Sequence, residues 1–69
     1  MSEAQAKKQL NKMLRSLTPG SLLHLLAEVF GGFAEEARQD NDLVSYEQCK
    51  RVEATLFVVG LGVDAAYPQ

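Results

Sequence analysis

The side chains with the most reactive chemistry in this 69-residue chain are a single cysteine and a single histidine. Cys49 would serve as a nucleophile or redox sensor if a neighbouring cation or histidine stabilised its thiolate. It falls, however, on a line of apolar residues at helical spacing, where an unpaired cysteine usually behaves as a small buried hydrophobe. We therefore predict that Cys49 is a packing residue without a catalytic role.

His24 lies among four leucines, with Glu28 one helical turn further along the chain. An imidazole oriented by a carboxylate is the usual arrangement of a general base. The sequence near this pair contains no nucleophile, and histidine and glutamate four residues apart are also ordinary neighbours on a helix surface. The sequence thus predicts a protein that is not an enzyme.

Acidic side chains, whose oxygen atoms suit divalent cations, gather in one stretch: Glu35, Glu36, Asp40 and Asp42. Their spacing fits no calcium-binding loop, so we expect a solvated helix end followed by a turn. The pair Gly60 and Gly62 lacks the preceding strand and the third glycine of a dinucleotide-binding fingerprint. One cysteine and one histidine are also too few for a closed zinc site. We expect no metal ion and no cofactor.

Charge is distributed unevenly along the chain. Residues 1–17 have a net charge of +3, and the remainder, with eight acids and three bases, has a net charge of −5. The early cations are Lys7, Lys8, Lys12 and Arg15. They could contact nucleic acid, but the acidity of the whole chain opposes avid binding, and a solvated helix face is the favoured explanation. A membrane-surface helix is not expected, because the segment lacks aromatic and bulky apolar residues.

Length and composition predict one small globular domain over residues 1–69, since 46% of the residues are apolar and 23% are charged. So short a chain gains little stability from one core and usually depends on disulfides, a metal ion or self-association. A single cysteine allows no internal disulfide, and with one histidine it allows no closed zinc site. Self-association is therefore the expected source of added stability. The sequence has no membrane-length apolar stretch and no secretory signal, so we expect a cytoplasmic protein.

The elements expected to position these residues are three helices. The first covers residues 3–17, with Ser2 and Gln5 spaced as a capping box and with residues 1–9 prone to fraying because they carry no apolar anchor. The second covers residues 19–39, with Thr18 as its cap and Pro19 in its first turn. Its main apolar stripe is expected to contain Leu22, Leu26, Val29 and Phe33, and a broader core-facing band adds Leu23, Phe30 and Ala37. The helix is expected to continue through the glycine pair at residues 31–32.

The third helix is expected to begin at Tyr46, with Ser45 and Gln48 forming a second capping box. Its apolar stripe should contain Cys49, Val52, Leu56, Val59 and Val63. A rival interpretation makes residues 55–59 a β-strand, because this run is rich in β-branched and aromatic residues. No second strand-like run exists in the chain to pair with it, so the helix is favoured.

The stretch at residues 56–63, with the sequence LFVVGLGV, is apolar on every side of a helix. A chain of this size cannot cover such a helix by itself, so part of it should meet another chain. The residues expected at this interface are Leu56, Phe57, Val58, Leu61 and Val63. The predicted fold is therefore all-α: an antiparallel helical hairpin with a short N-terminal amphipathic helix, paired into a helical-bundle homodimer.

By elimination, the expected function is that of a small protein–protein interaction module. It would bind a partner protein through an apolar helical surface and regulate, inhibit or chaperone it. The alternative is a nucleic-acid-associated accessory protein that uses the basic first helix.

Overall fold

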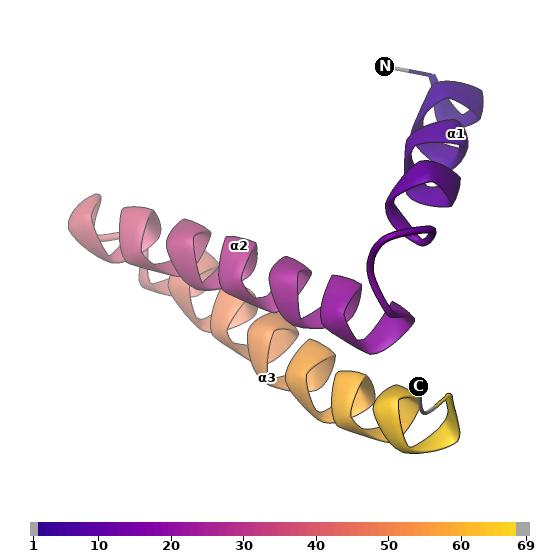
Figure 1. Ribbon diagram of the computed structural model, residues 1–69. Coiled ribbons are helices and arrows are strands. Elements are labelled where there is room, and N and C mark those ends of the chain that lie inside the picture. The colour runs from indigo at the N-terminus through magenta and orange to yellow at the C-terminus, as the bar shows by residue number, and fades with distance from the viewer. Residues whose placement is uncertain (1, 68–69) are drawn as a thin grey trace.

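The computed structural model describes residues 2–67, which form three helices and no strand. They are α1 (Glu3–Met13), α2 (Pro19–Gln39) and α3 (Leu43–Ala66). Helices α2 and α3 pack side by side in opposite directions along their whole length, whereas α1 turns away from them at the open end of the hairpin (Figure 1). The all-α class and the antiparallel hairpin predicted from the sequence are confirmed.

Helix α1 begins as the sequence predicts. The Ser2 hydroxyl accepts a hydrogen bond from the Gln5 backbone N–H, and the Gln5 side chain accepts one from the Ser2 N–H. The predicted end at residue 17 is wrong, because regular α-helix stops at Met13. Beyond it the N–H of Ser16 bonds to the carbonyl of Met13 in a tighter turn. The chain must then become extended at Thr18 because proline follows.

Helix α2 has the predicted bounds and the predicted cap. The Thr18 hydroxyl accepts a hydrogen bond from the Ser21 backbone N–H at 3.0 Å, and Pro19 occupies the first turn. A proline there loses no hydrogen bond that the helix needs. The glycine pair at residues 31–32 lies within the helix without interrupting it, as expected.

Helix α3 starts three residues earlier than predicted. Its N-cap is Asp42, whose carboxylate accepts the backbone N–H of Ser45, so the predicted capping box on Ser45 does not form. Hydrogen bonds from the hydroxyl and the N–H of Ser45 hold the pKa of Asp42 below its usual value. Asn41, with φ of 58°, supplies the left-handed turn that brings Asp42 into place. Residues 55–59 are helical, so the strand alternative is wrong.

Small residues form the contact between α2 and α3. The residues of α2 with the least exposed surface are Gly20, Ala27 and Ala34, which are spaced seven apart, and Gly60 is their buried counterpart on α3. A β-carbon added to Gly60 would lie 2.5 Å from the His24 ring and 3.5 Å from the carbonyl oxygen of Gly20. The two backbones therefore approach more closely than larger side chains would allow.

The apolar band predicted to form the core of α2 is divided by the structure. Leu22, Leu23, Phe30 and Ala37 are half-buried, but the other members lie outside the contact, so the prediction is wrong for them. Leu26, Val29 and Phe33 remain 41–49% exposed, and Val52 and Val59 of α3 are exposed as well. Among the described residues the only buried hydrophobic side chains are those of Ala27 and Ala34. The physical reason is that small residues already bring the two helices together along a different face. Within residues 2–67, these exposed apolar side chains have no other element packed over them.

Candidate interaction surface

Several exposed apolar side chains of α2 and α3 lie on one side of the hairpin. Ala27 and Ala34 face α3, so the residues just before them, Leu26 and Phe33, lie about 100° to one side. On α3, Val59 has the same relation to Gly60. Because the helices run in opposite directions, the exposed apolar residues of α2 and those of α3 form two rows on the same side of the hairpin.

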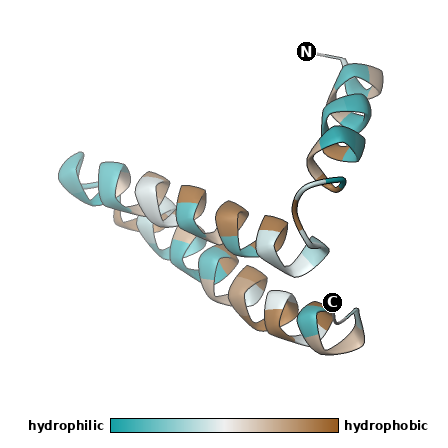
Figure 2. Ribbon diagram, viewed as in Figure 1, coloured by the Kyte–Doolittle hydropathy of each residue, from teal (hydrophilic) through white to brown (hydrophobic). Residues whose placement is uncertain are grey.

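We call this surface the broad apolar face and define it by six residues: Leu22, Leu26, Val29 and Phe33 of α2, with Val52 and Val59 of α3. Leu23, Phe30, Leu56 and Val63 are half-buried between the two rows. Figure 2 shows hydrophilic residues along the first turns of α1 and at the closed end of α2, and hydrophobic residues interspersed with hydrophilic ones over the rest of the hairpin. No residue of the face or between its rows is charged.

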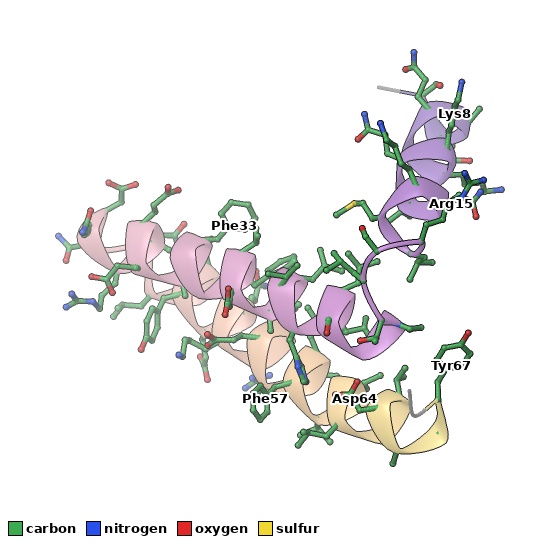
Figure 3. The ribbon with its side chains drawn as sticks, viewed as in Figure 1. Lys8, Arg15, Phe33, Phe57, Asp64 and Tyr67 are labelled. Atoms are coloured by element: carbon green, nitrogen blue, oxygen red, sulfur yellow. The ribbon has the colours of Figure 1, made fainter. Side chains whose placement is uncertain are left out.

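The opposite side of the hairpin is mixed in character. The rings of His24 and Phe57 stack there with their centroids 5.2 Å apart, and the Glu53 carboxylate lies over Gly31, where Lys50 pairs with it at 2.7 Å. This bond to Glu53 raises the pKa of Lys50. Figure 3 shows Phe33 and Phe57 projecting to opposite sides of the hairpin.

The interface residues predicted from the sequence do not form one surface. Leu56 and Val63 turn toward α2 and are half-buried. Phe57, Val58 and Leu61 are 52–67% exposed and lie away from the broad apolar face. We call these three residues the outer patch. The sequence identified α3 as apolar all round, but the larger uncovered surface is shared with α2.

The candidate catalytic residues serve packing. The ring of His24 covers Gly60, and its Nε2 atom is buried without a hydrogen-bond partner. No hydrogen bond joins His24 to Glu28 in the part of the chain that the structure describes. Cys49 is half-buried on the α2 side of α3. These positions assemble no nucleophile with a base.

The acidic stretch has structural partners. Glu35 forms an ion pair with Arg38 at 2.6 Å, and this hydrogen bond lowers the pKa of Glu35. Asp42 caps α3. Within residues 2–67, no three histidine, cysteine, aspartate or glutamate side chains lie close enough together to hold a metal ion. None of the helices described combines the length and apolar character needed to cross a membrane.

The predicted cationic contact residues are all exposed on or just after α1. Lys8, Lys12 and Arg15, together with Asn11 and Leu14, line an open hollow. Lys8 of α1 and Arg15, just after it, project away from the hairpin (Figure 3). Leu10 and Met13 fall on the opposite side of α1 from Lys8 and Lys12, so the apolar side of α1 faces the hairpin end.

No protein-family model, curated protein or solved structure matches this chain. The broad apolar face was missed from the sequence because its members were taken as core. The signal that could have placed it is the seven-residue spacing of Gly20, Ala27 and Ala34. Regularly spaced small residues on one helix are typical of close helix–helix contact, which pushes neighbouring large side chains outward.

Proposed function

We propose that this protein is a non-enzymatic interaction module that pairs with a second copy of itself through the broad apolar face. The dimer modulates another protein as a regulator, inhibitor or assembly chaperone in the cytoplasm. The observation that carries the proposal is an uncharged apolar surface, shared by two helices, that no other part of residues 2–67 covers. Uncovered apolar surfaces of this extent are typical of interaction sites.

The exposed area of the chain supports pairing with a second copy. A monomeric globular protein of 7.6 kDa is expected to expose about 4,300 Å². This chain exposes 5443 Å². The surplus of about 1,100 Å² exceeds the roughly 800 Å² that each partner buries in a standard stable interface. The radius of gyration, 13.9 Å, is likewise larger than the about 11 Å expected for a compact chain of this length.

Light scattering coupled to size-exclusion chromatography tests this proposal. We expect the mass of a dimer, twice 7.6 kDa, to persist across a wide dilution series, because apolar burial of this extent supports tight association. Moderate salt should leave the mass unchanged, since the face carries no charge. A chain that remains folded and monomeric at every concentration would contradict the proposal.

A second candidate function is nucleic-acid binding, which the hollow lined by Lys8, Lys12 and Arg15 favours. In a dimer this cationic side would occur twice. The function requires that a short fluorescent DNA duplex bind with an affinity that falls steeply as salt rises, because bound cations displace counterions from phosphates. Lys12→Ala should then weaken binding, whereas Arg51→Ala on α3 should not. Salt-independent or absent binding would exclude this candidate.

A further inference from the structure

Helix α1 carries an apolar side that its own hairpin does not cover. Leu10 and Met13 on this side are 44% and 39% exposed, and α1 makes at most marginal contact with α2 or α3. It leaves the open end of the hairpin on the side to which Phe33 projects (Figure 3). A partner packed on the broad apolar face would therefore lie next to α1.

The closed end of the hairpin combines exposed apolar residues with a charge opposite to that of α1. Residues 35–47, which we call the acidic tip, contain five acids and one arginine. Leu43 and Val44 in this tip are 66% and 68% exposed. The tip thus offers apolar side chains surrounded by negative charge, while α1 offers an apolar side flanked by positive charge.

Two symmetric arrangements place the broad apolar faces of two copies together. If the hairpins run parallel, each acidic tip lies beside the other tip, and the two basic N-terminal segments are neighbours. If they run antiparallel, each acidic tip lies beside the α1 helix of the other copy. Like charges placed together oppose association, whereas complementary charges favour it and fix the orientation. The antiparallel arrangement is favoured at both ends of the dimer.

We propose that two copies pair antiparallel and that α1 of each packs against the acidic tip of the other through its apolar side. This inference rests on the dimer proposed above and adds its orientation and the role of α1. The length of α1 suits this role: 11 residues span about 16 Å, enough to cross the layer of a partner hairpin stacked about 10 Å away. In this arrangement α1 is exposed in a single chain because the surface that packs against it belongs to the second copy.

Crosslinking between two different single-cysteine chains tests the orientation. Both carry Cys49→Ser; one adds Met13→Cys on α1 and the other Leu43→Cys in the tip. Within one chain these positions lie near opposite ends of α2, about 30 Å apart, so only a neighbouring chain can bring them together. Each variant is first checked for helix content by circular dichroism and for dimer mass by light scattering under reducing conditions.

A short bismaleimide reagent is then added to each variant alone and to an equal mixture. We expect a product containing one chain of each kind from the mixture, reaching up to about half of the chains because free exchange places about half of the dimers in mixed pairs. Each variant alone should remain uncrosslinked. Self-crosslinking of Leu43→Cys would show parallel hairpins and overturn the orientation. Dimers that give no mixed product would overturn the role of α1, and monomers would overturn the proposed dimer itself.

Discussion

Replacing Val59 by glutamate is expected to convert the dimer into monomers. Val59 lies on the broad apolar face, and two-fold symmetry places the new carboxylate in the interface twice. An unpaired charge removed from water costs several kcal/mol, and each 1.4 kcal/mol changes an equilibrium about tenfold. The dissociation constant should therefore rise at least about a thousandfold, measured by light scattering or sedimentation across a dilution series.

The neighbouring residue provides a matched control. Val58 has the same side chain and lies in the same turn of α3, but it is 67% exposed and points away from α2. Val58→Glu introduces the same charge with the same helix propensity, so it should leave the dimer mass unchanged. The reverse outcome, with Val58→Glu monomeric and Val59→Glu dimeric, would locate the interface at the outer patch and contradict the proposal.

Local signals in the sequence predicted most of the helix boundaries. Thr18 followed by Pro19 placed the start of α2 correctly, because a hydroxyl cap and a proline act through their immediate neighbours. The start of α3 was misplaced because two good caps, Asp42 and Ser45, stand three residues apart. The left-handed conformation of Asn41 decides between them. That conformation depends on how the hairpin closes, which short-range patterns do not specify.

The candidate surface was harder to predict. Apolar periodicity identifies which residues require burial, but it does not say whether their own chain or a second chain covers them. Leu26 and Phe33 fit a core stripe equally well in either case. The position of the small residues resolves the question, because Ala27 and Ala34 occupy the contact with α3 and turn the leucine and phenylalanine outward. The hairpin is thus a closely packed pair of helices in which Leu26, Val29 and Phe33 face away from the mutual contact.

Because Gly60 lies where α2 and α3 approach closely, Gly60→Leu is the substitution with the largest expected effect on the stability of the hairpin. A β-carbon at Gly60 already meets the His24 ring, and the rest of a leucine side chain would extend toward the backbone of α2. The helices would have to separate, and overpacking of this kind typically costs about 1–3 kcal/mol or more. Because a chain of this size rarely has more than about 3–5 kcal/mol of stability, the hairpin should lose most of its cooperative unfolding transition. Circular dichroism during a thermal scan measures this loss.

Gly62→Leu is the control, since a side chain at Gly62 meets nothing within 4 Å. Glycine costs about 1 kcal/mol in a helix relative to a good helix former, so this variant should unfold about 4–8 °C higher than the native chain. Gly60→Ala should fall between the two, because the His24 ring is able to move off Phe57 and make room. If Gly60→Leu and Gly62→Leu unfolded at the same temperature, the close approach of α2 and α3 at Gly60 would be refuted. The outward placement of the broad apolar face, which depends on that approach, would fail with it.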